Sequence, residues 1–310
     1  MKKIISIFAI MAVMPFVANA SDLTDAITNV RDACIGISDE IGDMKTMAGI
    51  NTAVTGVGTV AGGVALGAGI AKSNVDNKVS SLEQELAELS KLQGNNFDTL
   101  KISSNNLETI NNEIASYAAT IKQKQDDIKE LTDKSQTLGN IRTGTMAGAT
   151  ATNIAGTVIA AKNRVHGDLE SQIAECISAT KILSNVRIQA RIDGSATDNE
   201  LLQADKIISA CSGWEMVDLS KIDKRARGAT ISSAIGATTG IAGTITSAAA
   251  NTDATRDGDA QREKNLNATS NVLAGTTTAA SLTATVFNAT QISAIKKAAT
   301  VADECEGALK

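Results

Sequence analysis

Residues 46–71 constrain the fold of this chain most, because these 26 residues carry no charge and no aromatic ring yet include seven glycines. Each glycine in a helix interior is about 1 kcal/mol less favourable than alanine, so a helix here needs a close neighbour to compensate. Three later stretches are similarly uncharged and rich in Ala, Thr and Gly: 143–161, 228–252 and 265–295. Together the four stretches predict helices that pack against one another through small side chains.

Eight of the glycines form pairs four residues apart, which places both members of a pair on one helix face. Such pairs let two helix backbones approach closely, as is common between membrane helices. We interpret the stretches first as soluble antiparallel helices packed through Ala and Gly, and second as membrane-inserted helices. The predicted helix-packing pairs are Gly58 with Gly62, Gly63 with Gly67, Gly144 with Gly148, and Gly236 with Gly240.

The length and the composition of the four stretches give opposite indications of whether they span a membrane. The four stretches bracket the roughly 20 residues that a spanning helix needs. However, Thr and Asn are abundant in them, and aromatic residues make up only 2% of the chain, too few for a Trp and Tyr belt at the interface. Only residues 46–71 are a fair candidate for a spanning segment, and the other three stretches are marginal.

The first 20 residues have the features of a bacterial secretory signal peptide. Lys2 and Lys3 precede an apolar run over residues 4–17, and Ala18-Asn19-Ala20 provides a cleavage site. We therefore expect export to the periplasm or cell envelope, with membrane association or secretion still open. The predicted domains are the signal peptide at 1–20, a first helical hairpin with an arm at 21–192, and a second hairpin at 193–310.

The overall composition predicts an all-α fold of long antiparallel helical hairpins in a bundle. One proline and few aromatic residues argue against a β-sandwich or barrel, whereas abundant alanine favours long helices. The net charge of −5, without basic clusters interleaved with aromatic residues, argues against a nucleic-acid partner.

A coiled-coil arm is predicted after residue 72, where apolar residues follow a seven-residue rhythm in two runs. Turn residues in the sequences QGNN at 93–96 and SSNN at 103–106 separate the runs. The runs are in phase, so one unbroken helix is the alternative. The predicted seam residues are Leu82, Leu86, Leu89, Leu107, Ile110, Ile114, Ile121, Ile128, Leu131 and Leu138.

Shorter elements complete the expected fold. The apolar spacing predicts a helix over residues 21–44 that continues into 46–71, and another over 169–192. Gly194 begins a predicted turn, and Asp198 or Asn199 is a possible N-cap of a short helix over 201–210.

Four cysteines in an exported chain indicate two disulfides. Cys34 and Cys176 are equidistant from residue 105, and Cys211 and Cys305 are equidistant from residue 258. Residues equidistant from the tip of an antiparallel hairpin face each other, so we predict these two pairs. Reflection about the same centres also brings the uncharged stretches opposite one another. The alternative, if the two hairpins lie side by side, pairs Cys176 with Cys211 and Cys34 with Cys305.

No catalytic, cofactor or metal site is predicted. His166 is the single histidine and lies in a loop-like sequence, so it supports no catalytic triad, and scattered cysteines do not suit zinc. A match to the dinucleotide fingerprint G-x-G-x-x-A at residues 56–61 follows a helical pattern where that motif requires a strand.

We therefore expect a non-enzymatic structural or interaction protein of the bacterial envelope, whose coiled-coil arm self-associates or binds a protein partner. The alternative is a membrane-inserting protein that uses the glycine-rich hairpin. The predicted architecture resembles that of α-helical pore-forming toxins, although no sequence motif is shared.

Overall fold

The computed structural model describes residues 20–99, 107–252, 255 and 260–310. The described chain contains helices and no strand, which confirms the predicted all-α fold of long, mutually packed helices. The predicted signal peptide lies outside the described residues except for Ala20. The helices are α1 (Ala20–Cys34), α2 (Ile37–Thr99), α3 (Leu107–Lys162), α4 (Gly167–Asp193), α5 (Asp198–Cys211), the 3-10 helix η2 (Ser212–Met216), α6 (Leu219–Ala250) and α8 (Ala260–Leu309).

The chain forms two compact units, each assembled from separate segments. The first, here called the disulfide unit, comprises Met1–Lys45, Val165–Ile222 and Ser293–Lys310. The second, the hairpin unit, comprises Thr46–Arg164 and Asp223–Ile292. The boundary predicted between residues 192 and 193 falls inside the disulfide unit, because the chain enters the hairpin unit twice.

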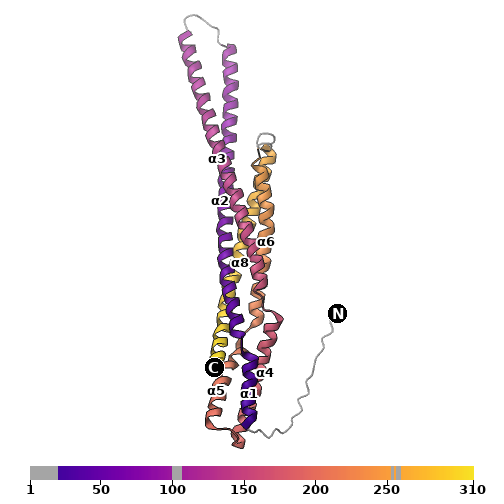
Figure 1. Ribbon diagram of the computed structural model, residues 1–310. Helices are drawn as coiled ribbons and strands as arrows, with labels where there is room; N and C mark the ends of the chain where they lie inside the picture. The colour runs from indigo at the N-terminus through magenta and orange to yellow at the C-terminus, as the bar shows by residue number, and fades with distance from the viewer. Residues whose placement is uncertain (1–19, 100–106, 253–254, 256–259) are drawn as a thin grey trace, which may run out of the picture. The chain divides into compact units, whose positions relative to one another are not determined.

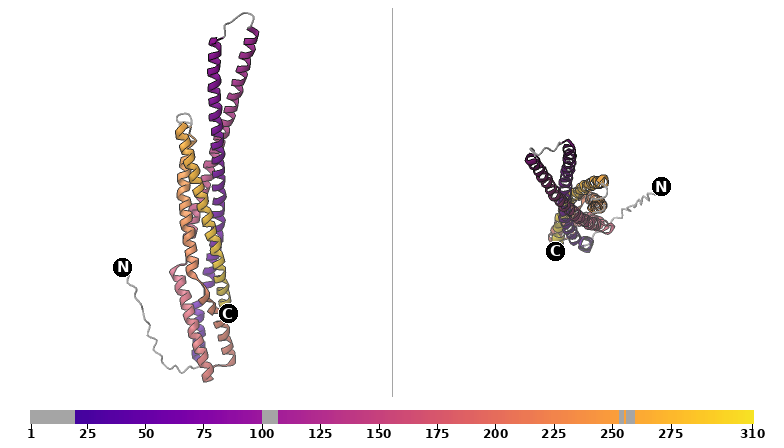
Figure 2. Two further views of the ribbon diagram at one scale, coloured as in Figure 1. Left: turned by 180° about the vertical axis from the view of Figure 1, so that it is seen from behind. Right: turned by 90° about the horizontal axis from the view of Figure 1, so that it is seen from above.

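The hairpin unit consists of α3 and the larger parts of α2, α6 and α8, running side by side (Figures 1 and 2). Within this unit, α2 and α3 continue past the ends of α6 and α8 as a two-helix arm (Figure 1). The turn suggested by QGNN is not observed, because α2 continues through residues 93–96 to Thr99. The single glycine of QGNN, with no proline beside it, is tolerated within the helix. The second turn candidate and the predicted turn around residue 258 lie mostly outside the described residues.

The disulfide unit has an apolar core. Helix α1 packs on α4, which also contacts α5 and η2. Large apolar side chains fill the space between these helices and the last segment of α8, and each is at most 1% exposed. They are Leu23, Val30, Ile37, Ile41, Leu169, Leu183, Ile207, Trp214, Ile222 and Ile295.

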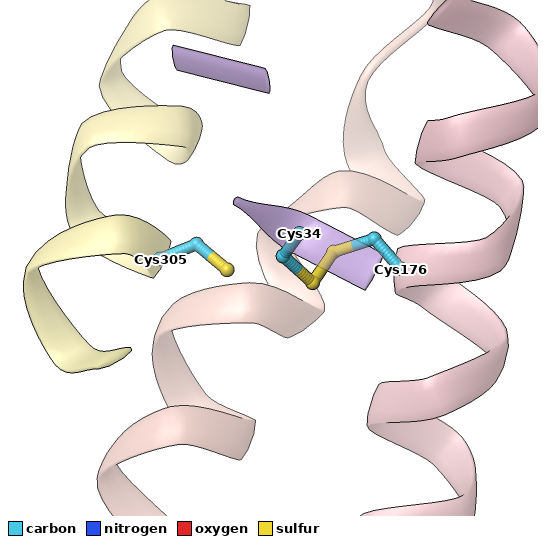
Figure 3. Close-up of side chains that lie close together, drawn as sticks. All are labelled: Cys34, Cys176 and Cys305. Carbon is cyan, nitrogen blue, oxygen red and sulfur yellow. A yellow bond between two sulfur atoms is a disulfide. The ribbon is translucent and has the colours of Figure 1, made fainter. Parts of the chain in front are cut away.

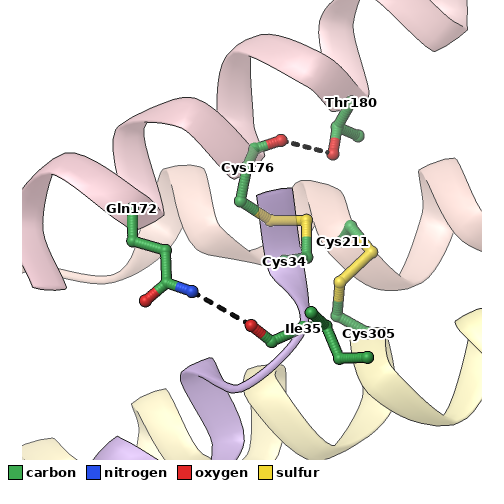
Figure 4. The surroundings of a disulfide bond; sticks show 7 residues. All are labelled: Cys34, Ile35, Gln172, Cys176, Thr180, Cys211 and Cys305. Atoms are coloured by element: carbon green, nitrogen blue, oxygen red, sulfur yellow. Dashed lines mark hydrogen bonds between the residues drawn. A yellow bond between two sulfur atoms is a disulfide. The ribbon is translucent and has the colours of Figure 1, made fainter. Parts of the chain in front are cut away.

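The continuous helix expected from residue 21 into 46–71 is interrupted at Gly36, so that prediction is wrong. Helix α1 ends at Cys34 and α2 begins at Ile37, with Gly36 between them at φ 86°. This left-handed conformation is open to glycine because it lacks a β-carbon. The side-chain amide of Gln172 donates to the carbonyl of Ile35 at 3.0 Å and holds the connection against α4 (Figure 4).

The connection between α4 and α5 has the predicted turn and a different cap. Gly194 ends α4 in the left-handed conformation, at φ 64°. The N-cap of α5 is Thr197, whereas the sequence suggested Asp198 or Asn199. Thr197 is preferred because Glu200 stands three residues later and completes a capping box, in which each side chain accepts a bond from the other residue's backbone N–H.

Candidate functional site

The outward-facing surface of the four packed helices in the hairpin unit is the candidate functional site. We define it, as the outer band, by the exposed residues in 47–70 of α2, 141–161 of α3, 231–248 of α6 and 268–290 of α8. Every exposed residue in these segments is Gly, Ala, Val, Ile, Leu, Met or Thr. The large ones are Met47, Ile50, Val57, Val60, Val64, Ile70, Ile141, Ile154, Val158, Ile231, Ile235, Ile241, Ile245, Val272, Leu282 and Val286.

The exposed threonines of the outer band do not need water to satisfy their hydroxyl donors. Each hydroxyl donates to a backbone carbonyl of its own helix, three or four residues earlier, at 2.8 to 3.0 Å. This local bond replaces a bond to solvent. The band therefore presents an almost entirely apolar surface. The threonines are Thr238, Thr269, Thr276, Thr283 and Thr290.

The interior of the same four helices is polar. Asn51 Nδ2 on α2 donates to Asn288 Oδ1 on α8 at 2.9 Å, and Asn153 Nδ2 on α3 donates to Ser281 Oγ on α8 at 2.8 Å. These four side chains are at most 1% exposed. The hydroxyls of Thr239 on α6 and Thr277 on α8 lie 2.9 Å apart. Side-chain hydrogen bonds thus join each of the other three helices to α8.

Few apolar side chains fill this interior. Among the described residues of the hairpin unit, Val75 and Met146 are the only buried Val, Leu, Ile, Met, Phe or Trp. Met146 packs with Ala65 and Ala274 in a small cluster, against which Leu66 and Leu273 lie partly buried. Burial of apolar surface therefore contributes little to holding the four helices together in water.

One end of the polar interior contains two fully buried cations. Lys72 is 1% exposed, and its ammonium lies 2.8 Å from a carboxylate oxygen of Asp76 and 2.8 Å from one of Glu263. Arg142 is 0% exposed and donates through Nε to Ser247 Oγ at 2.8 Å. Burial of a charge is unfavourable unless the group is paired and hydrogen-bonded. Lys72 is paired with two carboxylates, whereas the hydrogen-bond partners of Arg142 are uncharged side chains.

Asn267 connects the two cations into one network. Its side-chain oxygen accepts from Arg142 Nη2 at 2.8 Å, and its amide nitrogen donates to Asp76 and Glu263 at 3.4 Å each. All four helices contribute to this network. The sequence did not reveal this network, although Lys72 directly follows the first uncharged stretch. The signal that could have revealed it is the recurrence of polar residues at a seven-residue period along α8. These residues are Asn267, Ser270, Thr277, Ser281, Asn288 and Gln291.

The predicted helix-packing glycines fall into two groups. Gly58, Gly62, Gly236 and Gly240 face the interior, where a β-carbon on Gly62 would lie 3.3 Å from the Cα of Thr278. Gly63, Gly67, Gly144 and Gly148 are exposed, and a β-carbon there would meet no described atom within 4 Å. For this second group, packing against another helix of this chain is not observed. Adjacent positions such as 62 and 63 differ by about 100° around a helix and cannot both face inward.

The predicted seam of the arm faces inward but is incompletely buried. Leu82, Leu86 and Leu89 on α2 are half-buried, as are Ile114, Ile121, Ile128, Leu131 and Leu138 on α3. Leu107 and Ile110 lie on α3, but the burial of their side chains is not described. Lys124 interrupts the seam and pairs with Glu85 across the arm at 2.5 Å. Two helices alone leave one side of the seam accessible.

The four cysteines lie in the disulfide unit, and the predicted pairing is confirmed. Cys34 and Cys176 have an S–S distance of 2.00 Å, and Cys211 and Cys305 one of 1.98 Å. The two bridges are neighbours: the sulfurs of Cys34, Cys176 and Cys305 lie within 4.8 Å of one another (Figures 3 and 4). Since these sulfurs are in disulfides, they supply no thiolate to a metal ion.

By length and composition, one helical segment in the described chain could cross a membrane. It lies within Asp22–Lys91, and its 18-residue apolar window has a mean hydropathy of 1.6 and is 33% buried. This is a weak indication alone, because signal sequences and buried core helices pass the same test. A comparison with protein families, characterised proteins and solved structures finds no match to this chain.

Proposed function

We propose that the hairpin unit is embedded in a lipid bilayer, as the membrane part of an exported, non-enzymatic protein of the bacterial cell envelope. The observation that supports this proposal is the reversed distribution of side chains, with an apolar outer band and a polar interior. In water this distribution exposes apolar surface and buries polar groups, and both oppose folding. In lipid the outer band contacts hydrocarbon, while small residues and interhelical hydrogen bonds hold the helices together.

The length of the outer band suits a bilayer. Its large apolar residues run from Met47 to Ile70 on α2, over residues 141–158 on α3, 231–245 on α6 and 272–286 on α8. At 1.5 Å per residue these segments are about 21 to 35 Å long, and the hydrocarbon core of a bilayer is about 30 Å thick. The Asn, Ser and Arg residues that lower the average hydropathy of α3, α6 and α8 within the band segments face inward, where lipid does not meet them.

Membrane retention after an alkaline wash tests this proposal. Val60 on α2 is 68% exposed in the outer band, and Ile192 on α4 is 73% exposed in the disulfide unit. We expect the native chain and Ile192→Asp to stay in the washed membrane. Val60→Asp should be released, because an aspartate near the centre of a spanning helix costs about 2.5 to 3.5 kcal/mol. A native chain that washes into the soluble fraction would overturn the proposal.

The same embedded bundle could permeabilise the membrane, as its resemblance to pore-forming toxins implies. Vesicles loaded with a self-quenching dye measure this activity. We expect release by the native chain and less release by Gly62→Leu, since leucine at this inward position blocks close helix approach. Equal release by both chains would argue against a pore built from these helices.

The half-buried seam of the arm favours a second function, binding of a protein partner or of a second copy. Apolar residues at heptad positions are stabilised when a further helix covers them. We expect Ile114→Asp to abolish self-association or partner binding, and Ala115→Asp, at the adjacent exposed position, to leave it unchanged. Sedimentation velocity measures self-association. A chain that remains monomeric, with a thermal stability that Ile114→Asp does not alter, would exclude this role for the seam.

A further inference from the structure

One edge of the outer band is strongly basic. In the hairpin-unit segments that meet at this edge, residues 46–51, 157–164, 223–230 and 287–292, there are five cations and one acid. Lys162 directly follows the last exposed band residue of α3, and Arg227 precedes the first exposed isoleucine of α6, Ile231, by four residues. The cations are Lys162, Arg164, Lys224, Arg225 and Arg227, and the acid is Asp223.

Asp223 holds two of the arginines as a pair. Arg164 Nε lies 3.1 Å from Oδ1 of Asp223, and Arg227 Nε lies 2.6 Å from Oδ2 of the same carboxylate. The side chain of Asp223 is 17% exposed, whereas those of Arg164 and Arg227 are 40% and 59% exposed. Two guanidinium groups are therefore fixed next to one another at the surface.

The pair has the chemistry of a phosphate site. A guanidinium has five N–H donors and uses one at Nε, so each arginine can still donate through its terminal nitrogens. Arginine is suited to bidentate recognition of phosphate. One carboxylate between two guanidiniums leaves a local charge of +1, and the exposed Lys162 and Lys224 add to it. Arg225 is also fixed near this edge, since its guanidinium donates to the carbonyl of Thr290.

We propose that Arg164 and Arg227, oriented by Asp223, bind the phosphate of an anionic phospholipid at this edge of the outer band. The inference rests on the proposed membrane function, because the headgroup of a lipid whose tails contact the band lies at the band's edge. The opposite edge differs: its buried cations Lys72 and Arg142 are bonded within the interior network.

Partition of the full chain between vesicles tests the proposal. The vesicles are phosphatidylcholine alone and an equal mixture of phosphatidylcholine and phosphatidylglycerol. We expect the native chain to prefer the anionic vesicles, and Arg164→Gln with Arg227→Gln to reduce this preference by about fivefold for each arginine. The matched control, Lys134→Gln with Lys264→Gln, removes two exposed cations from the opposite edge and should reduce the preference less than the arginine substitutions do.

Asp223→Asn separates an oriented site from diffuse attraction. The substitution raises the positive charge of the edge, so diffuse attraction predicts stronger preference for anionic vesicles. An oriented pair predicts weaker preference, because the amide no longer anchors both arginines. Stronger preference would overturn the proposal, as would equal loss in the control variant. Inorganic phosphate that abolishes the preference would assign the site to free phosphate instead.

Failure of this inference is distinguishable from failure of the membrane function. A native chain that inserts equally into neutral and anionic vesicles would refute the lipid site and leave the embedded bundle intact. A native chain that inserts into neither would refute the membrane function. The arginine variants should insert into neutral vesicles as the native chain does, which shows that they fold.

Discussion

The disulfide unit and the hairpin unit bury opposite kinds of side chain. In the described part of the disulfide unit, Thr180 is the only buried polar residue, and large aliphatic side chains and Trp214 fill the core. In the hairpin unit the buried set includes Asn, Gln, Ser, Thr, Lys and Arg, with two large apolar residues among the described positions. The first unit has the apolar core expected of a protein domain in water, and the second has the distribution expected of helices in lipid.

Helix α8 shows the contrast within one element. Its buried positions follow a single seven-residue rhythm throughout. In the hairpin unit this seam carries Asn267, Thr277, Ser281 and Asn288. In the disulfide unit the same rhythm continues as Ile295, Ala298, Ala302, Cys305 and Leu309. Periodicity therefore marks the buried face in both units, whereas the polarity of that face differs between them.

The largest expected effect is loss of the bridge between Cys34 and Cys176. The bond closes a loop with a sequence separation of 142 residues, and the chain-entropy model assigns such a bridge about 5 kcal/mol. We expect Cys34→Ser with Cys176→Ser to unfold the disulfide unit at lower temperature. Amide hydrogen exchange should show lost protection in α1 and α4 while α3 keeps its protection over 143–161. Equal loss in both units would contradict their independent stabilisation.

The next largest effect concerns the buried polar network of the hairpin unit. Arg142→Leu removes the buried guanidinium and leaves the acceptors of Asn267 and Ser247 without this donor, which should destabilise the unit by about 1 to 3 kcal/mol for each acceptor. Arg191→Leu, at an exposed position on α4, should change the free energy of unfolding by about 0.5 kcal/mol or less. Thermal unfolding in detergent measures both. A neutral Arg142→Leu would mean that the network does not hold the four helices.

Adjacent glycines provide a smaller test of which face is inside. Gly62→Leu places side-chain atoms against the backbone of Thr278 and should destabilise the hairpin unit by about 1 to 3 kcal/mol. Gly63→Leu points into open space and should stabilise the helix by up to about 1 kcal/mol through its higher helix propensity. The same thermal unfolding experiment compares them. Destabilisation by Gly63→Leu would indicate that a second copy covers the exposed glycines.

The smallest effect concerns the capping box of α5 in the disulfide unit. The pKa of Glu200 lies below its ordinary value. The main cause is the hydrogen bond that its carboxylate accepts from the backbone N–H of Thr197, and the second is the bond that it accepts from the Thr197 hydroxyl. A depressed folded-state pKa stabilises the fold above the unfolded pKa, and this contribution is lost as the pH falls through the folded pKa. Glu200→Gln should therefore narrow the stability difference between neutral and acidic pH slightly. An unchanged pH dependence of the free energy of unfolding would exclude this contribution of Glu200.

Sequence reasoning predicted much of the fold correctly. Low proline and abundant alanine predicted long helices, and equal spacing from a hairpin tip predicted both disulfides. It did not find the break at Gly36, because glycine recurs throughout the neighbouring helix and only its φ angle distinguishes this one. The two compact units group segments that are distant in sequence, and composition along the chain does not indicate such grouping.

The candidate site was predicted less completely. The uncharged stretches locate the outer band along the chain, yet Thr, Ala and Gly occupy both its inner and outer faces. Average hydropathy therefore cannot separate a helix with polar residues facing its neighbours from one with the same residues facing water. The sequence did not predict the network of Lys72, Arg142 and Glu263 because its members are 70 to 191 residues apart.

The sequence by itself determined the helical class, the cysteine pairs and the position of the uncharged stretches, because these depend on composition and on spacing along one chain. The tertiary structure alone decided which face of each helix is buried and which glycines meet a neighbour. The physical reason is that burial is a property of the packed helices together. Gly62 and Gly63 are chemically identical and adjacent, and only the position of Thr278 leaves one of them without room for a side chain.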